Sequence, residues 1–336
     1  MARVAVNVPV QPGRFARLHR LSNGYGAAQQ RHWRLVAAIQ VLYASLLAVY
    51  LIGFHTWPSP DLMALAFLGF AVLAARGIGF LWDWSPFILL LLCYIALTGV
   101  IGGVVTRVHM QAPIDADRLI GFGHLPTLVL QAHFWHPDAP RWYDYAAVML
   151  YPMHFIAPLV LAFVLWQWRG GLYWRFVASY LLLCYNAFAT YLLYPAAPPW
   201  WASDQRRIPT VTRLLSQVPF GRAGTPVLLA ERFFLTNPVA AMPSLHAAAP
   251  VLVWLVSWRV WPRWGWTVVV YPLAMAVAVV YLGEHYVIDV LVGWVYALVA
   301  FAAIWGVGGK HFWHILLRLS GSKESRGQSS IAEAGS

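Results

Sequence analysis

The chain has 336 residues, of which 60% are hydrophobic and only 10% are charged, and its mean hydropathy is +0.61. Soluble domains carry about 25% charged residues, so this composition excludes an ordinary soluble protein. The apolar runs are also too long and continuous for the alternating strands of a membrane β-barrel. The net charge of +11 would suit a nucleic-acid-binding protein if the chain were soluble. In a membrane protein most of it follows from topology, so no nucleic-acid partner is expected.

Long apolar runs predict an all-α, polytopic bundle of membrane helices. At 1.5 Å per residue, roughly twenty residues cross the ~30 Å hydrocarbon layer. Trp and Tyr crowd the ends of the runs, where amphipathic rings prefer the headgroup layer. A basic tail, residues 1–32, precedes the first run, and a tail predicted to be disordered, residues 309–336, follows the last. The eight predicted spans are 33–54, 61–81, 84–106, 144–168, 172–194, 244–261, 264–282 and 286–308.

The distribution of lysine and arginine predicts the orientation of these spans. With the N-terminus inside, 15 of the 23 basic residues fall on the cytoplasmic side and eight outside. The short loops then obey the positive-inside rule, from which long loops are largely exempt. Both termini are therefore expected in the cytoplasm, with an uncleaved first span anchoring the chain in a plasma or inner membrane. The two long loops, 107–143 and 195–243, are expected outside, the first as short interfacial helices.

Two polar motifs at the ends of the sixth and eighth spans stand out. Pro243-Ser244-Leu245-His246 opens one span, where a helix start offers free amides and a positive dipole end to an anion. Ser244 can add a hydroxyl donor and His246 a proton. An ordinary capped helix with a buried histidine would look the same from sequence.

The second motif is His285-Tyr286-Val287-Ile288-Asp289. Positions i and i+4 share a helix face, so Asp289 is expected to accept from one imidazole nitrogen of His285 and leave the other nitrogen as a nucleophile. A structural His–Asp pair is the alternative. The two intervening spans run out and back, so His246 and His285 are predicted to converge at the outer boundary.

The loop between these elements supplies candidate phosphate ligands. Five arginines lie from Arg206 to Arg232, and the acidic residues near them are only Asp204 and Glu231. Arg213 and Arg222 have no acid close in sequence and are the preferred phosphate contacts. A solvated basic loop near anionic headgroups is the alternative.

Together these residues predict phosphoryl transfer through a phosphohistidine, without cofactor or metal. His285 is expected to attack phosphorus, with Asp289 steadying the imidazolium. Ser244, helix amides and arginines would neutralise the equatorial oxygens, and His246 would protonate the leaving oxygen. Water or a lipid alcohol would then attack the phosphohistidine.

The motifs resemble the type 2 phosphatidic acid phosphatase superfamily, whose pattern is Lys-x6-Arg-Pro, Pro-Ser-Gly-His and Ser-Arg-x5-His-x3-Asp. Pro243–His246 and His285-x3-Asp289 match the last two. Leucine in place of glycine, the tyrosine after His285, and Ala197-Pro198-Pro199-Trp200 are similar to the inositol phosphorylceramide synthase (inositolphosphotransferase) branch. The resemblance implies a six-helix core over residues 84–308, with the two spans of 33–83 as an addition. It also implies that His285 is the nucleophile, Asp289 its orienting acid and His246 the general acid.

The sequence departs from this family where the cations should be. Lys-x6-Arg-Pro is missing, since the only lysines are Lys310 and Lys323, and Val279 stands six residues before His285 in place of arginine. The cations must then come from the outer loop. Transfer of a phospho-headgroup to a lipid alcohol and hydrolysis of a phospholipid or polyprenyl phosphate both stay open.

Two functions of other classes are weighed against this one. Eight spans permit a transporter or flippase, although no charged residue lies near the middle of a confident span and transporters commonly place one there. A metallohydrolase could use His133 and His136, at i and i+3, with Asp115 or Asp117.

Overall fold

The computed structural model describes residues 77–105, 107–218 and 239–306, together with the single positions 42, 45, 66 and 69. The chain folds as two compact units, Met1–Asp83 and Trp84–Ser336, of which the second is described in detail. Several predicted segments lie wholly or almost wholly outside the described residues: tail 1–32, spans 33–54 and 61–81, Arg222 in the outer loop, and tail 309–336.

The described residues form helices and no strand, apart from two isolated β-bridges. The predicted all-α class is therefore confirmed. The helices are α4 (Gly77–Val104), α5 (Gln111–Ile120), α6 (Pro126–Phe134), α7 (Trp142–Leu150), α8 (Met153–Trp168), α9 (Gly170–Leu193), α10 (Pro199–Asp204), α11 (Leu214–Gln217), α13 (Leu245–Val260), the 3-10 helix η2 (Gly265–Val269), α14 (Val270–Tyr281) and α15 (Val287–Trp305).

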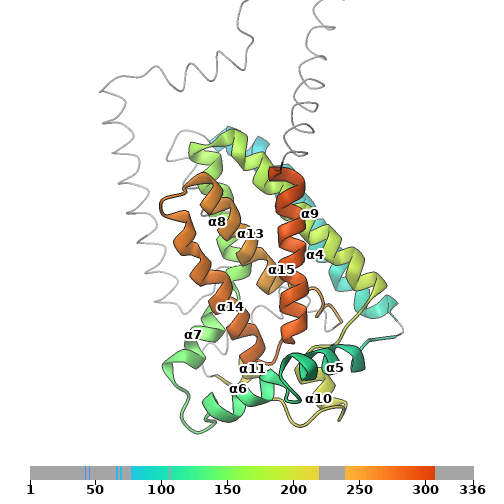
Figure 1. The fold of residues 1–336 in the computed structure, drawn as a ribbon. Coiled ribbons are helices and arrows are strands. Elements are labelled where there is room, and N and C mark those ends of the chain that lie inside the picture. Colours follow the sequence, from blue (N-terminus) through green and yellow to red (C-terminus); the bar gives the residue numbers. More distant parts are fainter. Residues whose placement is uncertain are drawn as a thin grey trace, which may run out of the picture. The chain divides into compact units, whose positions relative to one another are not determined.

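The long helices run side by side, and the short helices α5, α6, α10 and α11 gather at one end of them (Figure 1). This group comes from the two predicted outer loops. Helices α5 and α6 pack against α15 and α14 respectively, so the loops cover the end of the bundle at which the two histidine motifs lie. We call this the outer end.

The described residues contain three helices that are long and apolar enough to span a membrane. They are Gly79–Gly99 within α4, the whole of α9 and the whole of α15. The predicted span 144–168 is divided into α7 and α8, which bend by 55° and form a fourth span if counted together. The bend falls at Tyr151-Pro152, where proline cannot donate its amide to a continuing helix. Helix α13 and the η2–α14 pair are shorter than the spans predicted for them. The protein is thus an all-helical membrane protein, while eight spans and a six-helix core stay predictions.

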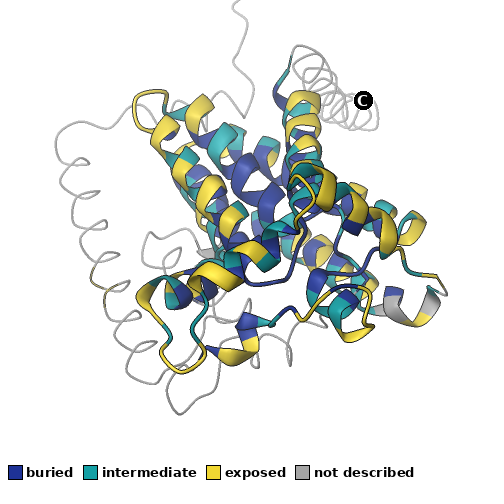
Figure 2. Ribbon diagram, turned by 60° about the horizontal axis from the view of Figure 1, so that its bottom comes forward, coloured by how far each residue is buried: buried dark blue, intermediate teal, exposed yellow. Residues whose placement is uncertain are grey.

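Helix α13 lies at the centre of the second unit and contacts α8, α9, α14 and α15. Residues 247–253 of this helix are buried in the centre of the unit (Figure 2), and they include the small residues Ala247, Ala248 and Ala249. Small side chains let membrane helices approach closely. Gly293 of α15 makes such a close approach, because a Cβ there would lie 2.4 Å from the carbonyl oxygen of Ser244. The two helices that carry the histidine motifs are therefore in backbone contact.

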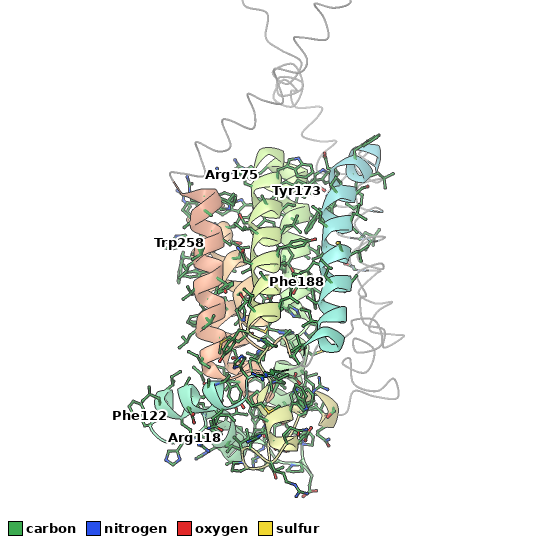
Figure 3. The ribbon with its side chains drawn as sticks, turned by 90° about the vertical axis from the view of Figure 1, so that its right-hand side faces the viewer. Arg118, Phe122, Tyr173, Arg175, Phe188 and Trp258 are labelled. Carbon is green, nitrogen blue, oxygen red and sulfur yellow. The ribbon has the colours of Figure 1, made fainter. Side chains whose placement is uncertain are left out.

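The opposite end of the bundle is held by Arg175 of α9. Its guanidinium donates to the carbonyl of Ile304 at 2.6 Å and lies over the ring of Trp305, 4.6 Å from its centroid. The Trp305 indole in turn donates to Ser179. Arg175 and Tyr173 lie at one end of the helices, and Arg118 lies at the other (Figure 3).

Candidate active site

The two motif histidines meet at the outer end of the bundle. Nδ1 of His246 lies 3.1 Å from Nε2 of His285. His246 is the second residue of α13, and His285 lies in the turn between α14 and α15. The out-and-back path predicted from the length of the intervening segment therefore brings them into hydrogen-bond contact, although they are 39 residues apart in the chain.

His285 is held differently from the way the i, i+4 spacing predicted. Helix α15 begins at Val287, with Tyr286 as its N-cap, so His285 precedes the helix. Its Nδ1 donates to the carbonyl of Ala241 at 3.0 Å and lies 3.6 Å from Oδ2 of Asp289. That oxygen accepts a hydrogen bond from the amide of Tyr286 at 2.9 Å. The carbonyl is thus the nearer partner of the imidazole, and the carboxylate is a longer charged contact.

This contact pattern determines where the protons lie. Two oxygens face Nδ1 of His285, so that nitrogen carries the proton and Nε2 is the free base. Nδ1 of His246 must then donate its proton to that Nε2. In this arrangement the lone pair of His285 Nε2 faces an N–H donor of His246. His285 is only 5% exposed, and Asp289 is fully buried.

Three short main-chain segments fix the carbonyl of Ala241. The amide of Ala241 donates to the carbonyl of Ala196, and the amide of Ala196 donates to Val239. Ala196 is also bridged to His109 on its other side. The Pro195-Ala196-Ala197 segment after α9 therefore forms the middle of a small ladder. One outer segment of this ladder, residues 239–241, carries the carbonyl of Ala241 that accepts the hydrogen bond of His285.

Ser244 joins the two motif helices. It is the N-cap of α13 and accepts from the amide of Ala247 at 3.3 Å. Its own amide donates to the carbonyl of Asp289 at 3.0 Å, and Tyr191 donates to the carbonyl of Pro243 at 2.8 Å. Ser244 is fully buried. Its hydroxyl proton remains available for donation while its oxygen caps the helix.

Two aromatic side chains that the sequence analysis did not single out enclose His246. The ring of Tyr151 stacks on it with centroids 4.1 Å apart, and His154 lies against it at 3.8 Å. Nδ1 of His154 donates to the carbonyl of Tyr151 at 2.7 Å. Both residues sit at the α7–α8 bend. In the sequence, this position is marked by Pro152 and His154, which interrupt an otherwise apolar segment.

Arg213 is paired, contrary to the expectation from its sequence neighbours. Its Nε donates to Oε1 of Glu284 at 2.7 Å, and the guanidinium lies 4.6 Å from the ring centroid of Trp200. The Trp200 indole donates to the other oxygen of Glu284 at 3.2 Å. Glu284 immediately precedes His285 and is 7% exposed. The pair spans 71 residues, so no local pattern could reveal it.

Gln131 of α6 fastens the segment before Arg213. Its amide nitrogen donates to the carbonyls of Thr212 at 2.8 Å and Tyr281 at 2.9 Å, and its oxygen accepts from the Thr212 amide at 2.9 Å. This one side chain ties the outer loop to the end of α14. Arg213 therefore stands on a fixed main chain beside the turn that carries His285.

Asp117 of α5 reaches the start of α15. Its Oδ1 accepts from the amide of Ile288 at 3.0 Å, and the side chain is fully buried. Burial raises the pKa of Asp117 to about 6, against the lowering effect of the backbone hydrogen bonds. From sequence alone this residue was a candidate only for metal binding.

The geometry of the proposed metal ligands does not favour the metallohydrolase alternative. Nδ1 of His133 donates to the carbonyl of Val129, and Nδ1 of His136 donates to that of Phe134. Across residues 77–105, 107–218 and 239–306, no three His, Cys, Asp or Glu side chains gather as a metal site would need.

Comparison with known proteins identifies relatives and a family. A Bacteroides thetaiotaomicron phosphoinositol dihydroceramide synthase is 31% identical over 128 residues, covering 36% of this chain and 42% of the relative. The catalytic subunit of inositol phosphorylceramide synthase from Schizosaccharomyces pombe is 27% identical over 175 residues, covering 49% and 39%. The chain thus spans about two fifths of the curated relatives it matches. No solved structure matches it. The family model described as the PAP2 superfamily matches residues 114–303, more than half of the chain, and the protein belongs to that superfamily.

Proposed function

We propose that this protein is a membrane lipid phosphotransferase that works through a phosphohistidine on His285. The observation that carries the proposal is the 3.1 Å contact between Nδ1 of His246 and Nε2 of His285, with the other nitrogen of His285 bonded to a carbonyl. A neutral imidazole presented in this way can act as a nucleophile. The membership in the PAP2 superfamily supports the same chemistry.

In the first step Nε2 of His285 attacks the phosphorus of the lipid substrate. A P–N bond forms, and the bond from phosphorus to the leaving oxygen breaks. The attack uses the lone pair that accepts the His246 hydrogen bond in the resting site. For this step His246 is the imidazolium, with a proton on each ring nitrogen. It releases its Nδ1 proton to the leaving oxygen and becomes neutral, so His246 acts as general acid. The imidazolium that forms at His285 is stabilised by the buried carboxylate of Asp289.

In the second step a hydroxyl group attacks the phosphohistidine. His246, now without its Nδ1 proton, takes the proton of the attacking hydroxyl as general base. The P–N bond breaks, and its electron pair returns to Nε2 of His285. Both histidines regain their starting state, so the cycle needs neither cofactor nor metal.

The negative charge on the phosphoryl oxygens needs donors nearby. Ser244 can offer its hydroxyl, and the first amides of α13 face the same end of the helix. We assign Arg213 as a cation of the site, held by Glu284 and Trp200. Arg222 remains a candidate that lies outside the described residues. Together these would replace the cations of the missing Lys-x6-Arg-Pro motif.

The donor and acceptor are proposed from the printed names of the relatives. Both names describe synthases of inositol-phosphate-bearing ceramides. We propose that the donor is a phospholipid carrying a phospho-headgroup and that the acceptor is a lipid alcohol. Hydrolysis of a phospholipid or polyprenyl phosphate uses the same first step, with water as the acceptor.

We propose that the site opens on the extracytoplasmic face and that both termini are cytoplasmic. The site lies at the end of the helices opposite Arg175 (Figure 3), and the short loops with lysine and arginine are expected inside. The exposed Ala139 of the outer loop offers a test, after Cys93 and Cys184 are replaced. A membrane-impermeant thiol reagent should label Ala139→Cys in intact cells, and protection until lysis would reverse the orientation.

The decisive experiment uses a lipid phosphodiester radiolabelled at phosphorus, with the purified protein in vesicles. His285→Ala and His246→Ala should each abolish turnover, and label should be trapped on His285 in the wild type. His133→Ala is the matched control, since that histidine is exposed and its Nδ1 bonds to the main-chain carbonyl of Val129. Full turnover by a folded His285→Ala variant would refute the mechanism.

The same assay separates the remaining alternatives. Release of inorganic or headgroup phosphate at full rate without a lipid alcohol would identify a hydrolase. Lipid transport that survives His285→Ala, with no label on the protein, would favour the transporter or flippase.

A further inference from the structure

Asp117 and Asp115 are two carboxylates on the same short helix with opposite surroundings. Asp115 is exposed, accepts from Gln111 at 2.8 Å and lies 4.0 Å from Arg118. Asp117 is fully buried, and its Oδ2 has no hydrogen-bond partner among the described residues. Burying a carboxylate with one oxygen unpaired is unfavourable. A neutral or apolar residue would serve stability alone at least as well.

The bonded oxygen of Asp117 acts on the start of α15. The amide of Ile288 has no partner within its own helix, because the first four amides of a helix lack an acceptor. Asp117 supplies one across 171 residues. Asp289 supplies another to the neighbouring amide of Tyr286. Two carboxylates, one from α5 and one from α15 itself, therefore cap the turn that begins directly after His285.

A second contact from α5 reinforces this connection. Ile114, one turn before Asp117, is fully buried in the cluster that also contains Tyr286, which is 1% exposed. Helix α5 thus contacts two of the three residues that follow His285: Tyr286 by packing and Ile288 through a main-chain hydrogen bond. The position of His285 relative to the carbonyl of Ala241 depends on this turn.

We propose that Asp117 is a positioning residue for His285, acting through the Ile288 amide to hold the first turn of α15 and so the aim of the Nε2 atom. This inference rests on the proposed function, in which His285 is the nucleophile. Its essential property is the hydrogen-bond acceptor at Oδ1. It couples helix α5, whose Arg118 lies beyond the lower end of the long helices (Figure 3), to the geometry of the reacting nitrogen.

The test compares four variants: Asp117→Ala, Asp117→Asn, Asp115→Ala and Asp115→Asn. The readouts are the rate of His285 phosphorylation in a single turnover, kcat and KM, and the melting temperature, all on monodisperse protein in vesicles. A misaimed nucleophile slows the chemical step with little effect on substrate binding. Asp117→Ala should therefore lower the phosphorylation rate and kcat about 10- to 100-fold, with KM within about twofold.

Asparagine keeps an oxygen at Oδ1, so Asp117→Asn should restore the rate to within about threefold of the wild type. Both Asp115 variants should match the wild type. Should Asp117→Ala not fold, Asp117→Val fills more of the same space without an acceptor and should show the same slow phosphorylation.

Two results would overturn the inference. One is wild-type phosphorylation in the folded alanine or valine variant. The other is an asparagine variant as slow as the alanine variant, because that would implicate charge in place of the hydrogen bond. A purely structural role would lower the melting temperature while leaving the rate per folded molecule unchanged. Failure of the proposed function is seen separately, as activity in His285→Ala.

Discussion

Replacing Gly293 by alanine tests whether contact between α13 and α15 sets the catalytic geometry. A Cβ at this position would lie 2.4 Å from the carbonyl oxygen of Ser244. That oxygen belongs to the N-cap residue of the helix that carries His246. Gly293 lies one turn beyond Asp289, on the same face of α15. The added methyl group would therefore push apart the two elements that carry the histidines.

The size of the effect follows from this distance. Main-chain atoms must move by about 0.6 Å to reach the 3.0 Å that real Cβ contacts require. Overpacking of this kind costs about 1–3 kcal/mol, partly offset by about 1 kcal/mol from the higher helix propensity of alanine. A displacement of 1 Å at an active site can cost about 100-fold in rate. We expect kcat to fall roughly tenfold and stability to fall by up to about 2 kcal/mol.

The measurement pairs turnover of a radiolabelled phospholipid with thermal unfolding in the same detergent. Gly171→Ala is the control, because a Cβ at Gly171 meets nothing within 4 Å and should leave kcat unchanged. If Gly293→Ala behaved like Gly171→Ala in both measurements, the close approach would not be needed to align the histidines.

Three further predictions concern the outer end. Burial raises the pKa of Asp117 from its ordinary value to about 6, so the ionised form destabilises the folded state. The free energy of unfolding should fall by about 3 kcal/mol as the pH rises from about 4 to above 6. Asp117→Asn should remove this dependence and raise the melting temperature at pH 7.5 but not at pH 4; equal curves would contradict it. Gln131→Leu leaves the main chain of Thr212 without its partners and should lower stability by about 2–4 kcal/mol in chemical unfolding, whereas an unchanged midpoint would contradict this. Glu284→Gln keeps the shape of the Arg213 contact without its charge. We expect KM for the phospholipid to change more than kcat, and identical kinetics would show that the pair does not act on substrate.

The site residues that could be predicted from sequence are those whose side chains can themselves carry out or support the proposed chemistry. His246, His285, Asp289 and Ser244 form two compact motifs, and the apolar segment between them has the length of two helices. Because helix rise and membrane thickness are nearly constant, that length predicts that both motifs return to one side. Their convergence needed no tertiary information.

The contacts that orient these residues could not be predicted in the same way. The acceptor of His285 is the carbonyl of Ala241, and a main-chain group has no sequence signature. The i, i+4 rule predicted that His285 lies on the face of a helix, but the helix begins two residues later, at Val287. One carboxylate oxygen of Asp289 accepts a hydrogen bond from the amide of the N-cap residue, Tyr286. Element boundaries depend on such capping competition, which only the folded main chain resolves.

Charge pairing over long sequence separations was decided by the tertiary structure alone. Arg213 looks unpaired beside its sequence neighbours, yet Glu284 reaches it from 71 residues away, and Asp117 reaches Ile288 from 171. Composition and the lengths of the apolar segments were sufficient to predict a helical membrane protein with two histidines at one boundary. This is because each residue's preference for the bilayer depends mainly on its own side chain. Which acid meets which cation or amide is determined by how loops pack on helix ends, and that depends on the whole chain at once.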